Sequence, residues 1–226
     1  MRVLAIDTAL SACSAAVLDT EHGGIVAGSL PMVRGHAEAL MPLLQRVMNQ
    51  ARITFADIDR IAVTTGPGSF TGLRVGIAAA RGIALAAGKP AVGLSTLSAY
   101  AAPHMAADAK LPVVVAIDAR HAQVYLQVFM PGGRSFSAPR LAPLREAVQA
   151  AAATPSCIVG SAAHAVAAAL SAGDTAPAVV DARAAPDIAW VARMGAVVPE
   201  DQSPLKPQYL RAPDAQPQNA AQLPRR

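Results

Sequence analysis

The chain reads Ile-Ala-Val-Thr-Thr-Gly-Pro-Gly-Ser-Phe-Thr-Gly-Leu-Arg-Val-Gly over residues 61–76, and this stretch carries the clearest pattern in the sequence. The apolar run over 61–65 predicts a buried strand, which the Gly-Pro-Gly after it breaks. Ser69 is a good N-cap for a helix that runs to about Ala87, where Gly-Lys-Pro ends it. A short strand over 91–94 follows. Strand, tight turn, helix and strand in succession are typical of an α/β domain.

The glycines of this stretch allow two interpretations. The sequence matches neither the Walker A loop, nor Gly-x-Gly-x-x-Gly, nor the nucleophile elbow Gly-x-Ser-x-Gly. The exposed N–H groups of a helix N-terminus can nevertheless hold an anion. Alternatively, Gly72 and Gly76 lie four residues apart on one helix face and let another element pack closely. We favour the packing interpretation, because glycine more often marks close backbone approach than catalysis.

The two halves of the chain show the same pattern. An apolar strand over 2–6 leads into Asp7, and another over 112–117 leads into Asp118. Each is followed by an antiparallel partner and then by helical periodicity, which predicts a duplicated α/β fold with mixed sheets, divided near residues 100–110. The other predicted strands are 13–18, 25–30, 124–129 and 156–160. The other predicted helices are 36–51, 143–153, 163–171 and 186–197. In the tail, 204–211 is expected to be extended and 213–226 to fray.

Composition excludes several classes of protein. Of the 226 residues, 53% are hydrophobic and 15% are charged, against roughly 25% charged in an average domain, so the chain is too apolar to be disordered. The net charge of +4 comes with no run of basic residues, which gives nucleic-acid binding weak support. The Ala-rich stretch 75–94 contains Arg81, Lys89 and Pro90, which argues against a membrane span. We expect a cytoplasmic protein whose low charge reflects a surface shared with another protein.

Few residues are candidates for chemistry. Asp7, Thr8 and Asp118 stand at strand ends, where carboxylate and hydroxyl oxygens can bind phosphate or magnesium; a polar strand end without a ligand is the alternative. The five histidines lie far apart and the two cysteines lack metal-ligand spacing, so we expect no metal site. A local Ser/His/Asp or Cys/His signature of nucleophilic catalysis is also missing from the sequence.

Six short motifs, spread from the start of the chain to its tail, resemble those of one family. They are Leu4-Ala5-Ile6-Asp7-Thr8, Arg34-Gly35-His36-Ala37-Glu38, the stretch 65–76, Ser95-Thr96-Leu97, Ile117-Asp118-Ala119-Arg120 and Tyr209-Leu210-Arg211. The family is TsaB (YeaZ), the subunits of tRNA threonylcarbamoyladenosine biosynthesis that are paralogues of the catalytic subunit TsaD. The resemblance implies an actin-like, Hsp70-like ATPase-type fold with two ribonuclease-H-like lobes. We expect an N-terminal lobe over 1–102, a smaller lobe over 103–200 and a Pro-rich tail over 201–226.

The same resemblance implies a function without catalysis. TsaB would bind and activate TsaD, which transfers threonylcarbamoyl from its adenylate to the tRNA adenosine beside the anticodon. The two metal-binding histidines of TsaD correspond here to Thr96 and Tyr100, and Ala9 replaces a glycine of the phosphate turn. The implied partners are TsaD, the small ATPase TsaE and, through the complex, tRNA; alone, the chain is expected to form a homodimer. It would hold no cofactor by itself, with ATP or ADP at or near the interface of the complex.

The helices predicted over 36–51 and 69–87 are the expected contact surface for TsaD. The candidate contact residues are Met41, Leu44, Met48, Leu73, Arg74, Ile77 and Ala80, of which the small ones allow close helix approach and the methionines adapt to a partner. The alternative is that these side chains only pack on the local sheet. A competing function is a weak ATPase or phosphotransferase that uses Asp7 and Asp118, whereas a peptidase has no nucleophile or metal pair to support it.

Overall fold

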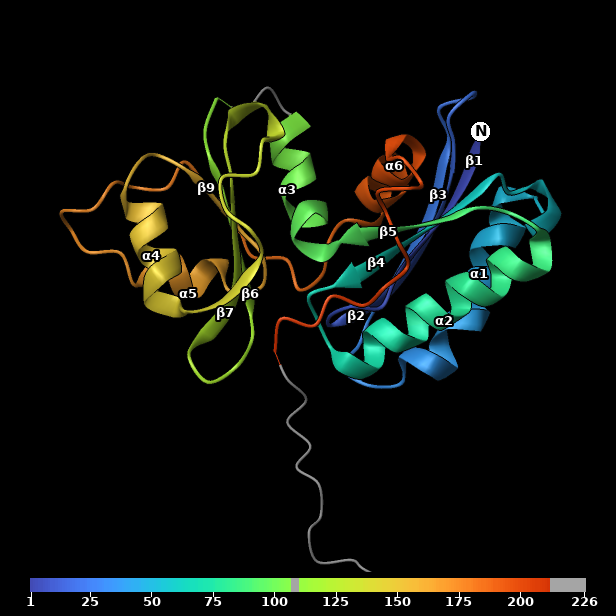
Figure 1. The fold of residues 1–226 in the computed structure, drawn as a ribbon, viewed down its shortest axis with the longest axis horizontal. Helices are drawn as coiled ribbons and strands as arrows, with labels where there is room; N and C mark the ends of the chain where they lie inside the picture. Colours follow the sequence, from blue (N-terminus) through green and yellow to red (C-terminus); the bar gives the residue numbers. More distant parts are fainter. Residues whose placement is uncertain (107–109, 212–226) are drawn as a thin grey trace, which may run out of the picture.

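The protein consists of two lobes, each built around a five-stranded mixed sheet (Figure 1). The computed structural model describes residues 1–106 and 110–211. In the first lobe the strand order is β3-β2-β1-β4-β5, with β1–β2 and β2–β3 antiparallel and β1–β4 and β4–β5 parallel. These strands are β1 (Arg2–Asp7), β2 (Ala12–Asp19), β3 (Ile25–Pro31), β4 (Arg60–Gly66) and β5 (Ala91–Ser95).

The second lobe repeats the first. Its sheet has the order β10-β9-β6-β7-β8, so that β6 takes the central place of β1 and the pairings have the same directions. This confirms the predicted duplication and the actin-like fold with two ribonuclease-H-like lobes. The strands are β6 (Val113–Asp118), β7 (Gln123–Phe129), β8 (Arg140–Pro143), β9 (Cys157–Val159) and β10 (Val179–Asp181).

Helices cover both faces of both sheets, and this is why the central strands read as continuous apolar runs. Along β1, Leu4 and Ile6 face α1 (His36–Ala51) and α2 (Phe70–Ala87), whereas Val3 and Ala5 face α6 (Ile188–Val197) on the opposite side. This alternation follows from the two-residue period of a strand. In the second lobe, α4 (Leu144–Ala152) and α5 (Ala163–Ala168) cover one face, and α3 (Thr96–Ala106) covers the other.

Two helices are exchanged between the lobes. Helix α3 follows the first sheet in sequence but packs on the second through Leu97 and Tyr100, and α6 follows the second sheet but packs on the first. Residues 188–197, which the expected lobe of 103–200 includes, thus pack on the sheet of the first lobe. Packing is close, since a Cβ at Gly195 would lie 2.3 Å from Cβ of Ala62. Arg60 of β4 also donates to the carbonyls of residues 195 and 198 at 3.1 Å.

Three elements were not predicted, each for a physical reason. Strands β8 and β10 have only four and three residues, too few for an alternating pattern. Helix α3 is buried on nearly all sides, so its apolar residues show no helical period. Short 3-10 helices lie at Phe55–Asp57, before β4, and at Pro131–Gly133, between β7 and β8. The predicted extended stretch 204–211 has neither helix nor strand, and 213–226 lies outside the described residues.

Helix α2 is the one described helix that is long and apolar enough, by length and composition, to cross a membrane. In the structure its inner face packs against the first sheet through Leu73, Ile77 and Ala80. Its outer face carries Arg74 and Arg81, both exposed. The helix therefore has the two-sided character of a helix that covers a sheet.

Candidate functional site

The structure does not bring the three predicted phosphate or magnesium residues together. Asp7 ends β1 inside the first lobe and is fully buried, as is Thr8 beside it. Asp118 ends β6 in the second lobe and is exposed at the cleft between the lobes. The equivalent strand ends of the two halves thus have different environments: one carboxyl is part of the interior, and the other faces an open space.

The Asp7 carboxyl is held by the chain itself. Its Oδ1 accepts hydrogen bonds from Thr64 Oγ1 at 2.5 Å and from the backbone N–H of Ala9 at 3.1 Å, while Oδ2 has no partner among the described residues. Burial raises the pKa of Asp7, and the bonds from Thr64 and Ala9 and the nearby His36 oppose that rise. In this structure the Asp7 carboxyl connects the end of β1 to β4 and to the turn that follows β1.

The start of α2 is packed on the turn between β1 and β2. The N–H of Ser69 donates to the carbonyl of Ala9 at 2.7 Å, and Thr8 Oγ1 donates to the carbonyl of Gly72 at 2.7 Å. A Cβ at Gly72 would lie 2.1 Å from the Thr8 carbonyl oxygen, and one at Gly68 would lie 2.4 Å from that of Ala9. These contacts confirm the packing interpretation of the glycines. Carbonyl oxygens of the chain occupy the helix start, so the residues of the first lobe do not fit a nucleotide phosphate there.

A cleft of about 500 Å³ lies between the lobes. Its lining includes Ser69 and Phe70 of the first lobe, Asp118 and Ser161 of the second, and residues 208–211 of the tail. Asp118 is fixed there: its N–H donates to Ser161 Oγ at 3.0 Å, and its Oδ1 accepts from the N–H of Arg120 at 2.8 Å. The cleft is thus polar on its second-lobe side and more apolar on its first-lobe side.

The turn between β6 and β7 has an unusual backbone. Three successive residues that are not glycine, Arg120, His121 and Ala122, have positive φ values of 64°, 52° and 56°. Such residues usually avoid this region, so the surrounding hydrogen bonds must hold the turn in place. The sequence predicted that 124–129 pairs with 112–117 and so implied a turn here, but it did not predict the positive φ values of three successive residues.

A second group that was missed stands at the mouth of the cleft. The rings of Phe70 and Tyr209 lie with centroids 5.0 Å apart, and Cζ of Arg74 sits 3.7 Å from the centroid of Phe70. Arg74 Nε also donates to the Tyr209 hydroxyl at 3.2 Å. We call Phe70, Arg74 and Tyr209 the aromatic clasp. Phe70 and Arg74 belong to the motif over 65–76, and Tyr209 belongs to the motif Tyr209-Leu210-Arg211. Membership of these motifs was the one sequence feature that could have pointed to the group.

Known proteins match much of the chain. A family model described as TsaD, tRNA N6-adenosine threonylcarbamoyltransferase, matches residues 12–138. The TsaB protein of Escherichia coli is 40% identical over 125 residues, which are 55% of this chain and 53% of that protein. An uncharacterized protein of Mycobacterium tuberculosis is 35% identical over 221 residues, 95% of this chain and 94% of its own. The solved structure of YeaZ from Pseudomonas aeruginosa has a TM-score of 0.76 at 26% identity, covering 92% of this chain and 99% of that one.

The chain belongs to the TsaB (YeaZ) family. The match spans about half the length of the curated TsaB relatives. Thr96 and Tyr100, the positions expected to correspond to the TsaD histidines, lie in the core: Thr96 is fully buried, and the buried Tyr100 donates its hydroxyl to the carbonyl of Arg183 at 2.8 Å. Burial is the main cause that raises the pKa of Tyr100. This pair serves packing between the lobes and does not have the donor set of a metal site.

Most of the residues predicted to contact TsaD are buried inside the chain, which corrects that assignment. The helices are amphipathic, and the apolar stripe that suggested an interface faces their own sheet. Met41, at 52% exposure, and Arg74 of the aromatic clasp lie on the outer side. The five buried residues are Leu44, Met48, Leu73, Ile77 and Ala80.

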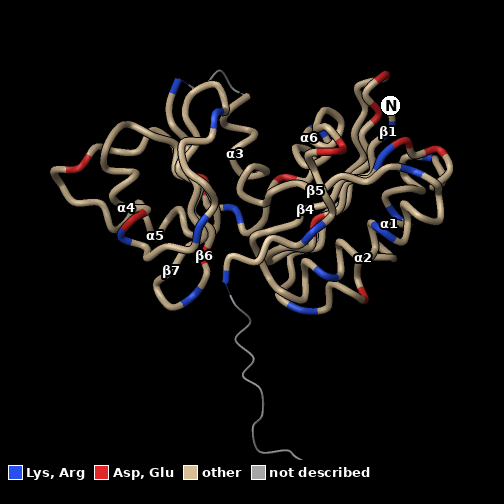
Figure 2. Tube along the Cα trace, in the orientation of Figure 1, with Lys and Arg blue, Asp and Glu red and all other residues tan. Residues whose placement is uncertain are grey.

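The outer side of α1 and α2 carries other exposed apolar side chains. Leu85 is 87% exposed near the end of α2, Val33 is 74% exposed before α1, and Phe70 lies partly exposed at the start of α2. Charged residues on these helices are mainly basic, and Figure 2 shows Lys and Arg dispersed over both lobes. We call the outer side of α1 and α2 the helical face.

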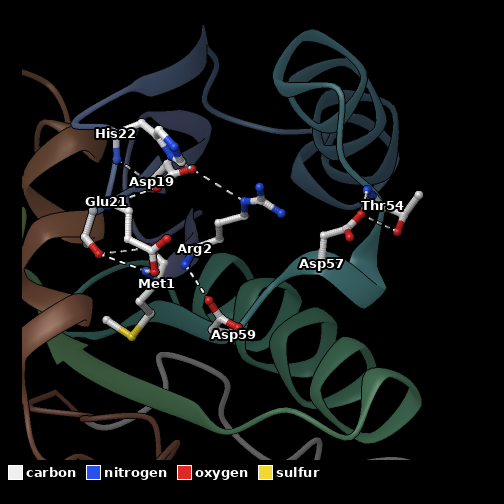
Figure 3. A network of polar contacts seen from close by, with 9 residues as sticks. Met1, Arg2, Asp19, Glu21, His22, Thr54, Asp57 and Asp59 are labelled. Carbon is white, nitrogen blue, oxygen red and sulfur yellow. Dashed lines mark hydrogen bonds and ion pairs between the residues drawn. The ribbon is translucent and has the colours of Figure 1, made fainter.

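A cluster of polar groups surrounds the N-terminus (Figure 3). The Met1 ammonium pairs with Glu21 Oε1 at 2.8 Å, and Asp19 Oδ2 lies 3.0 Å from His22 Nδ1. The ligand atoms of Asp19, Glu21 and His22 lie within 4.8 Å of one another, close enough to share a cation. The hydrogen bond with His22 is the first cause that lowers the pKa of Asp19. Ion pairs and turn hydrogen bonds account for the cluster, so we assign it a structural role.

Proposed function

We propose that this protein is a non-catalytic subunit of tRNA threonylcarbamoyladenosine biosynthesis, which binds TsaD and activates its transfer of threonylcarbamoyl to the adenosine beside the anticodon. One observation carries the proposal. The chain has the fold of the TsaB family, but the glycines of α2 pack on the strand end that holds Asp7. A protein that keeps the family fold, but whose helix start packs on backbone carbonyl oxygens at the phosphate turn, is suited to binding a partner.

The helical face is the proposed contact surface for TsaD. Met41 of α1 and Leu85 of α2 present apolar side chains to solvent, and Ala78 and Gly82 of α2 are exposed and small, so a partner helix can approach closely. Exposed apolar groups on a protein surface often mark such contacts. In the absence of TsaD, the same face would support a homodimer.

The other proposed associations follow from the family. TsaE and tRNA would join through the complex with TsaD, and the chain by itself would bind no cofactor. ATP or ADP would be held at or near the interface of the complex. The packing of Gly68 and Gly72 against the carbonyl oxygens of Ala9 and Thr8 supports this assignment.

Size measurement tests the proposal directly. Light scattering after gel filtration should show a complex when the chain and TsaD are mixed at micromolar concentration. Leu85→Glu should weaken it strongly, because a charge placed in an apolar interface loses its hydration. Phe136→Glu is the matched control, since Phe136 is also an exposed apolar side chain (71%) but belongs to the second lobe. Two separate peaks for the unmodified proteins would refute the proposal, and tRNA modification with and without the chain would test activation.

A weak ATPase or phosphotransferase is the second candidate, and the position of Asp118 favours it. That carboxylate lines the cleft, whereas the Asp7 that was predicted to act with it is buried. Calorimetry with ATP and magnesium should detect binding that Asp118→Asn removes, if this function exists. A lack of ATP turnover by the chain alone would reject it.

A further inference from the structure

Residues Ser203–Arg211, which we call the strap, run from the region of α6 back across the first lobe and end between the two lobes (Figure 1). The strap has neither helix nor strand, so its conformation depends on contacts with the rest of the chain. Its contacts lie on the first lobe for most of its length and on the second lobe at its end.

The strap is anchored to the first sheet by backbone hydrogen bonds. The N–H of Gly93 in β5 donates to the carbonyl of Ser203 at 2.8 Å, and the N–H of Gln208 donates to the carbonyl of Thr65 in β4 at 2.7 Å. The strands leave room for the strap through glycine. A Cβ at Gly93 would lie 2.5 Å from the carbonyl oxygen of Pro204, and one at Gly66 would lie 2.9 Å from that of Gln208.

Side chains of α2 hold the strap from the outside. Arg81 donates to the carbonyl of Leu205, whose side chain packs on the core of the first lobe. Further along, Tyr209 joins the aromatic clasp with Phe70 and Arg74. Aromatic pairs and cation–π contacts of this kind are attractive. The strap is thus fixed to the first lobe at several points before it reaches the cleft.

The last residue of the strap contacts the second lobe. Arg211 Nη1 donates to the carbonyl of Ala119 at 2.7 Å, the residue just before the left-handed turn Arg120–Ala122. Hydrogen bonds within the turn, such as Gln123 N–H to the carbonyl of Arg120 at 3.0 Å, keep it in place. A charged donor on a fixed carbonyl is a strong and directional contact.

We infer that the strap fixes the angle between the two lobes. Arg211 makes the connection, because it links the part of the strap held by the first lobe to the β6–β7 turn of the second. Lobes or domains joined by modest interfaces normally move relative to one another. The strap counters this motion, because it is anchored to β4, β5 and α2 at one end and to Ala119 at the other. The distance between the two sides of the cleft would then stay constant, and the two lobes would move as one rigid body.

Distances between spin labels on the two lobes test the lock. Labels on Gly24→Cys in the turn between β2 and β3, away from the helical face, and on Ala168→Cys in α5 occupy exposed positions, whereas the native Cys13 and Cys157 are buried. In the full chain, without TsaD, we expect a narrow distance distribution. Arg211→Ala should broaden it by about twofold or more, as expected when interdomain motion is released. Arg134→Ala, an exposed arginine of the second lobe, should leave it unchanged.

A second variant perturbs the strap at its other end. Gly93→Ala should displace the strap and broaden the distribution, whereas Gly82→Ala, where an added Cβ meets no described atom within 4 Å, should not. Circular dichroism would confirm that each variant is folded. A distribution that stays narrow in folded Arg211→Ala would overturn the inference. The measurement needs no partner, so its outcome is independent of TsaD binding.

Discussion

The carbonyl oxygen of Thr8 occupies the space that a side chain at Gly72 would need, since a Cβ there would come within 2.1 Å of it. The hydroxyl of Thr8 also donates to the carbonyl of Gly72, so that the first turn of α2 and the end of β1 are joined directly. This contact explains two features at once. It requires glycine in the motif, and it fills the place where a phosphate would approach.

Gly72→Ala should therefore destabilise the protein by about 3 kcal/mol, because the backbone of β1 cannot move away cheaply. Urea unfolding would measure this loss. Gly82→Ala in the same helix is the matched control and should stabilise the protein by about 0.5–1 kcal/mol, since Gly82 is exposed and alanine is the better helix former. Equal effects of the two substitutions would contradict the packing described for Gly72.

The Asp7 carboxyl should make stability fall as pH rises. Its pKa is raised in the folded protein by burial, so between the ordinary aspartate pKa of 3.8 and the folded value the native state binds more protons than the unfolded state. The free energy of unfolding then decreases with increasing pH across that window, and the contribution is fully present only below the ordinary pKa. Asp7→Asn should remove this part of the pH dependence in urea titrations from pH 4 upwards.

Thr64→Val should strengthen the pH dependence that Asp7→Asn removes. The Thr64 hydroxyl bond lowers the pKa of Asp7, so its removal should extend the decline to higher pH. Identical pH profiles for wild type, Asp7→Asn and Thr64→Val would show that Asp7 does not titrate in the way proposed.

Much of the fold followed from periodicity, because strands and helices that cover both faces of a sheet leave a strong apolar pattern. The same argument could not place the exchanged helices. Helix α3 is apolar on most sides, so no face could be assigned to it. Contacts between residues far apart in sequence, such as Arg211 with Ala119, leave no local pattern. The pattern of Leu73 and Ile77 indicated an important helix face correctly, but periodicity does not distinguish a core from an interface.

Arg60 should hold the exchanged helix α6 in place. Its guanidinium donates to the carbonyl of Gly195 in the last turn of that helix and to the carbonyl of Val198 just after it, and it pairs with Glu200. Arg60→Met should reduce the free energy of unfolding by about 1.5–3 kcal/mol, the usual contribution of hydrogen bonds to a charged group. Hydrogen exchange should be faster in α6 than in α1. Arg134→Met, at an exposed site, should change neither quantity.

Leu73 lies on the buried side of α2 and Leu85 is exposed, so the same substitution should separate core from surface. Leu73 is buried against the first sheet, so Leu73→Glu places an unpaired charge in the interior and should cost more than about 3 kcal/mol, a large fraction of the total stability of a domain. Leu85 is 87% exposed, and Leu85→Glu should change stability by no more than about 0.5 kcal/mol. Thermal unfolding followed by circular dichroism measures both. A stable, folded Leu73→Glu protein would show that this face of α2 is not part of the core, and the original assignment of Leu73 to a partner surface would be restored.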